Sequence, residues 1–192
     1  MLTRLIFSAL WALVVAQRLW EMRLSRAHER KLRSAGATEH ARAQMPWMVA
    51  LHAAWLAAML LEVWLLERPF SLALAVPALL LFALGQSLRL CAMRALGERW
   101  TVRVITPAQG GAPITDGIYR YLRHPNYLGV ALEVLALPLV HGAYLSALSF
   151  SLLNAVLLCV RIRAEERALS ATSSYAAAFA GRPRFIPQGP TP

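Results

Sequence analysis

Charged side chains are scarce in this chain of 192 residues: they make up 16% of it, whereas soluble domains carry about 25%. Hydrophobic residues account for 58%, and the mean hydropathy is +0.47. This composition excludes an ordinary soluble domain and an intrinsically disordered chain. Lysine and arginine outnumber aspartate and glutamate by 20 to 10, and all the bases except Lys31 are arginine. So many bases on so apolar a chain indicate charges at one edge of a lipid bilayer rather than a surface for nucleic acid.

Signature motifs of soluble nucleotide-binding enzymes, zinc proteases and serine hydrolases are missing. The sequence contains no GxGxxG, no GxxxxGK[ST], no HExxH and no GxSxG. The two cysteines, Cys91 and Cys159, form no CxxC pair and lie in apolar runs, so they indicate neither a disulfide nor a metal site. We therefore predict no metal, no nucleic-acid partner and no obligate protein partner.

Apolar segments predict an all-α integral membrane protein with about five transmembrane helices, since each crossing needs about 20 apolar residues. The first three candidates are Leu2–Trp20, Met45–Leu66 and Pro69–Leu90, and a basic cytosolic loop, 21–45, separates the first two. The last two helices share 127–160, which is barely long enough to cross twice. We therefore expect a tight C-terminal helical hairpin.

The positions of the bases set the expected orientation. In a five-helix arrangement, 18 of the 20 lysines and arginines fall on one side, and only Arg4 and Arg68 fall on the other. The positive-inside rule then places the N-terminus outside and the C-terminus in the cytosol, as in a bacterial inner-membrane protein. The chain 1–192 is predicted to form one membrane domain, with three N-terminal helices in 1–90 and a core with a cytosolic loop and tail in 91–192.

An aromatic and basic motif, G-I-Y-R-Y-L-R-H-P-N-Y-L-G at 117–129, precedes the fourth predicted helix. Its tyrosines and arginines are also typical of a membrane edge, and that alternative stays open. Pro125 disfavours helix at His124, so the first turn that follows presents unpaired N–H groups to an anionic ligand. With Asn126 and Tyr127 close by, the motif indicates a site for a polar ligand that enters from the cytosol.

A second charged cluster, R-I-R-A-E-E-R at 161–167, ends the fifth predicted helix. Arg161 and Glu165 share a helix face because they are four residues apart. Since the fourth and fifth helices are antiparallel neighbours, we expect this pair near His124 and Tyr127, where it can hold a zwitterion. The alternative is a solvated helix end with an ion pair between Arg161 and Glu165.

Three ionisable residues, His52, Glu62 and Glu133, fall inside the predicted spans. A carboxylate at that depth is costly unless it is paired or wet, and a substrate tunnel and a structural hydrogen bond are equal alternatives for Glu133. We interpret His52 and Glu62 as polar contacts between helices. In the tail, Arg182 and Arg184 are predicted to bind anionic lipid headgroups.

The run G-x-Y-R-x-x-R-H-P-x-Y-x-G, followed further on by R-x-x-x-E-E, resembles the isoprenylcysteine carboxyl methyltransferase family and the related membrane phospholipid methyltransferases. The resemblance covers roughly 95–185 and makes 91–192 a methyltransferase core. It implies S-adenosyl-L-methionine bound at the cytosolic face and a lipidic substrate that arrives from the bilayer. The residues that it places around the cofactor are Pro113, Ile114, Tyr119, His124, Pro125, Asn126, Tyr127 and Glu165.

The predicted catalytic residues are Arg161 and Glu133. The resemblance implies that Arg161 binds the acidic group of the substrate, which it would orient for methyl transfer. An acceptor that is already ionised needs no strong base, because the protein then supplies proximity, alignment and a dry site. If the acceptor is a plain phenol, Glu133 or His124 becomes a candidate general base.

The N-terminal half resembles the bacterial branch found beside type III polyketide synthases, whose enzymes O-methylate alkylpyrones or alkylresorcinol-type lipids. The features that carry this resemblance are Gln17-Arg18-x-x-Glu21, Glu29-Arg30-Lys31, Gly36-Ala37-x-Glu39, His52, and Glu133 followed by Leu137-Pro138-Leu139. We predict O-methylation of a hydrophobic carboxylate, acidic enol or phenol. The alternatives are a prenylcysteine or phospholipid methyltransferase, an NADPH-dependent membrane reductase and a small membrane scaffold without enzymatic activity.

Overall fold

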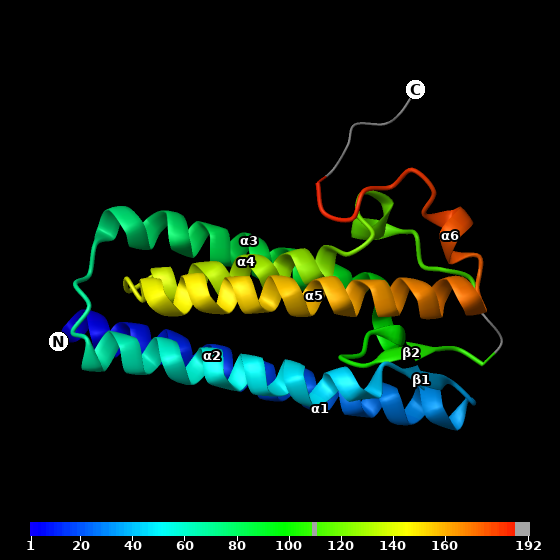
Figure 1. Cartoon of the computed structure of the whole chain (residues 1–192), viewed down its shortest axis with the longest axis horizontal. Coiled ribbons are helices and arrows are strands. Elements are labelled where there is room, and N and C mark those ends of the chain that lie inside the picture. Colours follow the sequence, from blue (N-terminus) through cyan, green and yellow to red (C-terminus); the bar gives the residue numbers. More distant parts are fainter. Residues whose placement is uncertain (109–110, 187–192) are drawn as a thin grey trace.

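The computed structural model describes residues 1–108 and 111–186, and most of them are helical (Figure 1). In chain order the elements are α1 (Leu2–Ser34), β1 (Thr38–His40), η1 (Arg42–Gln44), α2 (Met45–Leu65), α3 (Leu72–Leu96), η2 (Gly97–Arg99), β2 (Val104–Thr106), η3 (Gly117–Arg120), α4 (Pro125–Leu139), α5 (Tyr144–Thr172) and α6 (Tyr175–Ala178). The predicted all-α membrane fold is confirmed.

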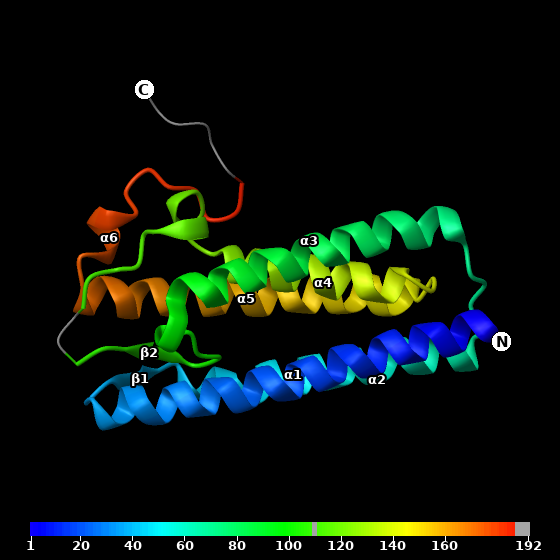
Figure 2. The same cartoon turned by 180° about the vertical axis from the view of Figure 1, so that it is seen from behind.

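The long helices form two layers (Figures 1 and 2). One layer holds α1 and α2, and the other holds α3, α4 and α5. Within the second layer, α3 and α4 approach closely because Gly85 and Gly129 face each other. A Cβ atom on Gly85 would lie 2.8 Å from the carbonyl oxygen of Gly129, and one on Gly129 would lie 2.6 Å from that of Gly85. Such a backbone-to-backbone contact requires glycine on both helices.

The apolar core joins the two layers in the half of the bundle nearer the N-terminus. Trp55 and Met59 of α2 pack there with Phe7 of α1 and with Val134 of α4. The indole Nε1 of Trp55 donates a hydrogen bond of 3.1 Å to the backbone carbonyl of Val134. The opposite half, which carries β1, β2 and α6, is here called the site end (Figure 1).

The number of long spans differs from the prediction. Within residues 1–108 and 111–186, four helices, α1, α2, α3 and α5, are long and apolar enough to cross a membrane by length and composition. The fourth predicted span is α4, which has 15 residues. It therefore measures about 22 Å at 1.5 Å per residue, short of the roughly 30 Å of a hydrocarbon core. The expected tight hairpin is formed by α4 and α5, but α5 continues past residue 160 to Thr172.

The predicted basic loop 21–45 is wrong in its first part, because α1 continues to Ser34. This segment is rich in arginine, leucine and glutamate, which favour helix. Its buried face carries Glu21 and Ser25. The hydroxyl of Ser25 donates to Glu29 at 2.7 Å and accepts the backbone N–H of Val102 at 2.9 Å. The extension of α1 thus forms one wall of the site end.

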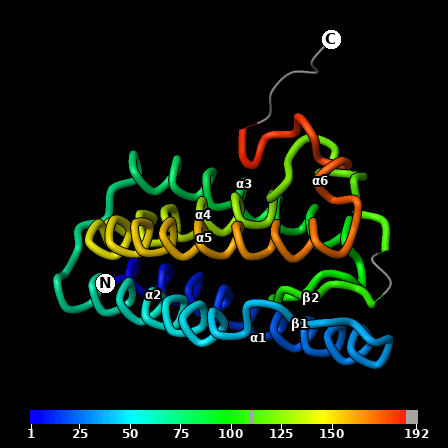
Figure 3. Tube along the Cα trace, turned by 45° about the vertical axis from the view of Figure 1, so that its right-hand side comes forward, coloured from blue at the N-terminus to red at the C-terminus, as the bar shows by residue number. Residues whose placement is uncertain are grey.

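A small antiparallel sheet at the site end was not predicted (Figure 3). Strand β1 pairs with β2, so that Thr38 lies opposite Thr106 and His40 lies opposite Val104. The carboxylate of Glu39 forms ion pairs with surrounding arginines, which are Arg33, Arg42 and Arg103. The sheet ties the segment after α1 to the segment after α3.

The C-terminal tail folds back onto the 117–129 motif, while binding of its arginines to lipid headgroups stays a prediction. The backbone N–H groups of 123–124 donate hydrogen bonds to carbonyls of the tail. Arg182 donates to the carbonyl of Tyr119 at 2.9 Å, and Arg184 forms a two-pronged ion pair with Glu166 at 3.0 and 2.6 Å. Both guanidinium groups find protein acceptors, because the tail passes directly over the motif and the end of α5.

Candidate functional site

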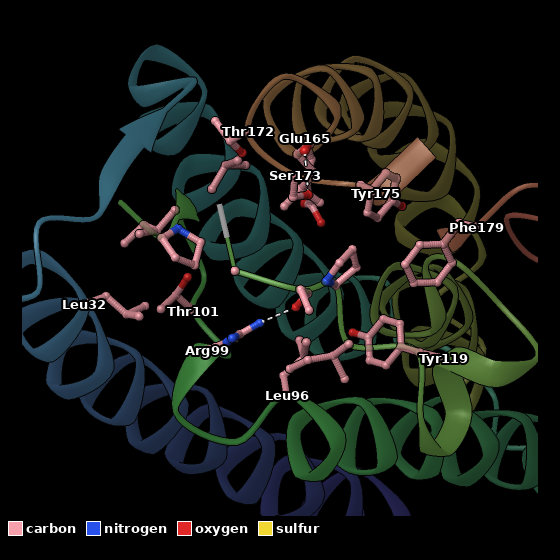
Figure 4. Close-up of a pocket in the computed structure, with 18 of the residues that line it drawn as sticks. Leu32, Leu96, Arg99, Thr101, Tyr119, Glu165, Thr172, Ser173, Tyr175 and Phe179 are labelled. Atoms are coloured by element: carbon pink, nitrogen blue, oxygen red, sulfur yellow. Dashed lines mark hydrogen bonds between the residues drawn. The ribbon is translucent and has the colours of Figure 1, made fainter. Parts of the chain in front are cut away.

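Two cavities lie at the site end. The first, the loop pocket, has a volume of about 150 Å³ and is formed by β2, the loop after it, η3, α6 and the end of α5 (Figure 4). The second, the bundle pocket, has a volume of about 430 Å³ and lies between the two helix layers. Thr101 lines both cavities, so they lie on either side of this residue or next to it.

The loop pocket gathers part of the predicted cofactor set. Pro113, Ile114, Tyr119 and Glu165 all line it. In Figure 4, Glu165 lies on the opposite side of the pocket from Tyr119. Residues that sequence reasoning missed complete the wall: Arg99, Thr101, Arg103, Arg123, Tyr175 and Phe179. The pocket therefore combines one carboxylate with several guanidinium groups and aromatic rings.

The bundle pocket gathers a different part of the prediction. Asn126, Tyr127 and Glu133 line it from α4. The structure thus assigns these residues to the larger, more apolar cavity, and not to the loop pocket where Glu165 lies. The remaining wall comes mainly from α1 and α2 and includes the methionines Met22, Met45 and Met48. Methionine adapts to ligands of varied shape, which suits a cavity that receives a lipid chain.

A chain of hydrogen bonds links the two pockets at Tyr127. The part of their walls formed by Tyr127, Arg161 and Glu165 is here called the partition. The hydroxyl of Tyr127 donates to the Glu165 carboxylate and accepts from Nε of Arg161 at 3.2 Å. The Nη2 atom of Arg161 donates to the backbone carbonyl of Val102 at 2.6 Å. The predicted proximity of the α5 cluster to the motif is confirmed at Tyr127. The alternative ion pair between Arg161 and Glu165 is not found among the described residues.

Arg161 and Glu165 both keep an unsatisfied charge. Arg161 is 2% exposed, and no carboxylate in the described part of the chain forms an ion pair with it. Glu165 likewise has no cationic partner there, and its Oε1 atom accepts no hydrogen bond from the described residues. An unpaired buried charge is costly, so a ligand with opposite charges would be stabilised most at the buried Arg161 and also at the half-buried Glu165.

His124 and Pro125 line neither pocket. Pro125 is the first residue of α4, where its missing N–H needs no partner. The buried ring of His124 places Nε2 3.0 Å from Oε1 of Glu166, the carboxylate that also binds Arg184. These contacts hold the start of α4 against α5. His124 and Pro125 therefore fix the start of α4 and so the position of Tyr127, which itself forms part of the partition.

Two tyrosines of the loop pocket stay neutral. Burial raises the pKa of Tyr119 well above its ordinary value, and the negative charge of Glu165 raises it further. Burial also raises the pKa of Tyr175, with a further contribution from Glu165 and Glu166. Neutral phenol rings offer aromatic faces and hydroxyl groups to a ligand, without a charge that would compete with Glu165.

Glu133 belongs to a closed ring of four charged side chains in the wall of the bundle pocket, here called the charge ring. Its members are Arg18 and Glu21 of α1, Arg89 of α3 and Glu133 of α4. Arg18 pairs with Glu21 at 2.7 Å and also with Glu133, while Arg89 pairs with Glu21 at 2.5 Å and with Glu133 at 3.0 Å. Glu133 is thus ion-paired, as the structural alternative expects, and it also lines a cavity, while its place in a substrate tunnel stays a prediction.

In the sequence, the two bases of the charge ring, Arg18 and Arg89, count among those that indicate the orientation of the chain in the membrane. The spacing offers one local signal, because Arg18 and Glu21 are three residues apart and share a face of α1. Their partners on α3 and α4 are far away in sequence, so the ring becomes visible only in the folded chain.

Comparison with known proteins agrees with this geometry. Residues 78–171, which run from α3 nearly to the end of α5, match the isoprenylcysteine carboxyl methyltransferase (ICMT) family. The chain is 36% identical to the uncharacterized protein YpbQ of Bacillus subtilis over 164 residues, which cover 85% of this chain and 96% of that protein.

Two further relatives extend the comparison. A protein-S-isoprenylcysteine O-methyltransferase of Schizosaccharomyces pombe is 37% identical over 90 residues, which are 46% of this chain and 38% of the yeast protein. An uncharacterized protein of Haemophilus influenzae is 27% identical over 162 residues, 83% of this chain and 92% of that one. The matched region contains the motif, α4 and the Arg161–Glu165 cluster, and the chain belongs to the isoprenylcysteine carboxyl methyltransferase family of membrane methyltransferases.

Proposed function

We propose that this protein transfers a methyl group from S-adenosyl-L-methionine to an acidic oxygen of a hydrophobic acceptor. The loop pocket holds the methyl donor, and the bundle pocket holds the acceptor. The observation that carries the proposal is the pair of unsatisfied charges, Arg161 and Glu165, on either side of Tyr127 at the partition. With the site end in the cytosol, as the positive-inside rule expects, the donor enters from water and the acceptor from the bilayer.

The loop pocket offers groups that match each part of the donor. Glu165 suits the ammonium of the methionine part, because its Oε1 has no partner among the described residues. Guanidinium groups of Arg99 and Arg123 suit the carboxylate. The rings of Tyr119 and Tyr175 suit the adenine and the sulfonium, since a cation over an aromatic face gains about 0.5–2 kcal/mol.

A buried cation, Arg161, lies directly behind Tyr127 and Val102 in the wall of the bundle pocket, although it does not line the pocket itself. Arg161 already donates to Tyr127 and Val102, which fix the orientation of its planar guanidinium. Its Nη1 atom has no partner in the described chain, and we assign to it the acidic oxygen of the acceptor. A carboxylate or an acidic enol, such as that of an alkylpyrone, is ionised near neutral pH and needs no general base.

S-adenosyl-L-methionine, when bound, supplies a methyl group that its sulfonium already activates. The contribution of this chain is therefore alignment and the exclusion of water. We assign to Tyr127 and Arg161 the alignment of the acceptor oxygen, near Thr101, which lines both pockets. The same arrangement suits a prenylcysteine carboxylate, so prenylcysteine stays the alternative acceptor.

Binding of S-adenosylhomocysteine to the purified protein in detergent tests the donor site. We expect binding to the wild-type protein, and a loss of affinity of about tenfold or more in Glu165→Gln, equivalent to about 1.4 kcal/mol. Glu98→Gln is the matched control, because Glu98 is exposed and pairs with Lys31 outside both pockets. Absence of binding, or equal affinity in Glu165→Gln and wild type, would contradict the proposal.

Two further measurements separate the alternatives. The first adds NADPH as a competitor, because the arginines of the loop pocket also suit phosphate groups. Displacement of S-adenosylhomocysteine by NADPH at comparable concentration would favour the reductase. Transfer of labelled methyl groups into a bacterial lipid extract, followed by mass spectrometry, identifies the acceptor. A scaffold without activity would give neither binding nor transfer.

A further inference from the structure

One ring nitrogen inside the bundle pocket is unused by the protein. His52 of α2 lines this pocket, and its Nδ1 lies 2.8 Å from the backbone carbonyl of Met48 on the same helix. A carbonyl only accepts hydrogen bonds, so in the neutral ring Nδ1 carries the proton and Nε2 is an acceptor. No group in the described part of the chain donates to Nε2. The expected contact of His52 with another helix is therefore not formed.

The charge ring and His52 line the same cavity. Arg18 and Glu133 face it from α1 and α4, and His52 faces it from α2. The side chain of Arg18 is 18% exposed, more than that of any other member of the charge ring. The pocket thus presents a guanidinium donor and an imidazole acceptor in an otherwise apolar cavity between helices.

The chemistry of these two groups selects a hydroxyl. A hydroxyl oxygen accepts a hydrogen bond from a guanidinium, and its proton is donated to an imidazole nitrogen. A ketone or an ether has no proton to donate to Nε2 of His52. A second carboxylate would be repelled by Glu21 and Glu133, which face the same cavity. A plain hydrocarbon chain would leave polar groups of the wall without a partner, at a cost in free energy.

The distance along α4 sets where this hydroxyl lies on the acceptor. Tyr127 marks the partition and Glu133 marks the charge ring, six residues further along the same helix. At 1.5 Å per residue the two levels are about 9 Å apart. The second polar group is therefore expected near the middle of a long-chain acceptor, well removed from the oxygen that is methylated.

We propose that His52 and the charge ring form a second recognition site, which binds a hydroxyl group in the body of the acceptor about 9 Å deeper in the bundle than the methylated oxygen. This inference rests on the proposed function, because it assigns the bundle pocket to the methyl acceptor. It adds a specificity-determining residue, His52, and among the acidic amphiphiles of the proposed function it favours those that carry a hydroxyl in the chain.

Binding of four synthetic probes to the purified full chain in detergent micelles tests the inference. The probes are hexadecanoic acid, 2-hydroxyhexadecanoic acid, 8-hydroxyhexadecanoic acid and 8-methoxyhexadecanoic acid. Trp55 and Trp100 line the bundle pocket, so tryptophan fluorescence reports occupancy. We expect 8-hydroxyhexadecanoic acid to bind about tenfold more tightly than the other three, because one hydrogen-bonded hydroxyl has about that effect. Equal affinity for all four probes, or no binding of any, overturns the inference.

Variants assign the preference to His52. In His52→Leu the advantage of the 8-hydroxy probe should fall below about twofold, whereas His52→Gln, which keeps an acceptor, should retain part of it. Ser87→Ala is the control, because Ser87 is exposed on α3 and its hydroxyl bonds only to its own helix. A preference that survives in His52→Leu overturns the assignment.

A titration with S-adenosylhomocysteine on the same samples separates the two proposals. If it binds while all four probes bind equally, the second recognition site fails and the donor site stands. If it does not bind while the preference for 8-hydroxyhexadecanoic acid holds, methyl transfer fails and the hydroxyl site in the bundle pocket stands.

Discussion

Nη2 of Arg161 donates a hydrogen bond of 2.6 Å to the backbone carbonyl of Val102, 59 positions earlier in the chain. The N–H of Val102 donates in turn to the hydroxyl of Ser25 on α1. A single buried guanidinium therefore connects α5, through the loop before β2, to the far helix layer. Since Thr101 and Val102 line the bundle pocket, Arg161 also fixes the wall against which the acceptor would lie.

Replacement of this guanidinium by an ammonium tests its geometry. In Arg161→Lys we expect kcat/KM for methyl transfer into a lipid extract to fall about 100-fold, or about 2.7 kcal/mol. The physical reason is that a lysine cannot donate to Tyr127, to Val102 and to an acceptor oxygen in the planar arrangement that arginine allows. The affinity for S-adenosylhomocysteine should change less than about threefold, because Arg161 does not line the loop pocket.

Arg163→Lys is the matched control for this substitution. Arg163 lies on the same helix, is exposed, and lines neither pocket. Its transfer rate should stay at the wild-type level. If Arg161→Lys also keeps wild-type kcat/KM, or if it loses donor affinity and transfer equally, the assignment of Arg161 to the acceptor is wrong.

The charge ring predicts strong coupling between two residues of different helices. Glu133→Leu leaves Arg18 and Arg89 without one of their two carboxylates, and we expect a loss of about 3–5 kcal/mol in the free energy of unfolding in micelles. Arg89→Met should be similarly costly. The double variant should lose clearly less than the sum, because it removes an opposite pair of charges together.

The control for this cycle pairs Glu133→Leu with Glu62→Gln. Glu62 lies near the other end of the bundle, where it accepts hydrogen bonds from the backbone of Leu145 and Ser146 and so holds the first turn of α5. It shares no partner with Glu133, and the two losses should add within about 0.5 kcal/mol. Additive losses for Arg89 and Glu133 as well would show that the ring acts only as separate contacts.

The sequence allowed the class of fold to be predicted, because hydropathy and helix length are local properties. It also allowed Tyr127 to be placed near Arg161, since a short connection forces α4 and α5 to be antiparallel neighbours. The expected role of Glu62 as a contact between helices is confirmed by its bonds to α5. Each of these inferences needed only spacing within one segment or across one turn.

Contacts between distant segments could not be predicted in this way. The register of β1 on β2 joins Thr38 to Thr106, and nothing in either three-residue strand specifies the other. The charge ring likewise requires α1 to lie against α3 and α4, which no single-segment pattern determines. The predicted span ends at Trp20 because hydropathy detects only the apolar part of a helix. The polar residues that follow still favour helix, and α1 continues to Ser34.

Support of the partition by the tail predicts an effect at a distance. Arg184 holds Glu166, which holds His124 at the start of α4. In Arg184→Ala we expect the affinity for S-adenosylhomocysteine to fall about threefold to tenfold, because Glu165 is the neighbour of the loosened Glu166. Titration of the variant in detergent measures this loss. Arg163→Ala, an exposed position on α5, the helix that carries Glu166, should bind like wild type. An equal loss in both variants would point to a general charge effect.

The stability of the sheet at the site end should depend on pH through Glu39. Burial alone raises the pKa of this carboxyl, but hydrogen bonds and charges from Arg103 and Arg33 lower it more, so that it lies below its ordinary value of 4.5. A lowered pKa means that the ionised form stabilises the fold above pH 4.5, and that this contribution is lost as the pH falls through the lower, folded-state pKa.

Chemical unfolding of Glu39→Gln in micelles, measured between pH 7 and pH 3, checks this dependence. At pH 7 the variant should be less stable than wild type by about 1–2 kcal/mol, a modest figure because the arginines around Glu39 are partly exposed. The difference should shrink as the pH falls below 4.5, because the carboxyl of the unfolded chain then binds a proton before that of the folded chain does. Glu67→Gln, with a side chain 78% exposed and 3.8 Å from Arg4, should differ little from wild type at any pH. A stability gap for Glu39→Gln that stays constant down to pH 3 would mean that the charge of Glu39 does not hold the sheet, and that its packing against β2 does.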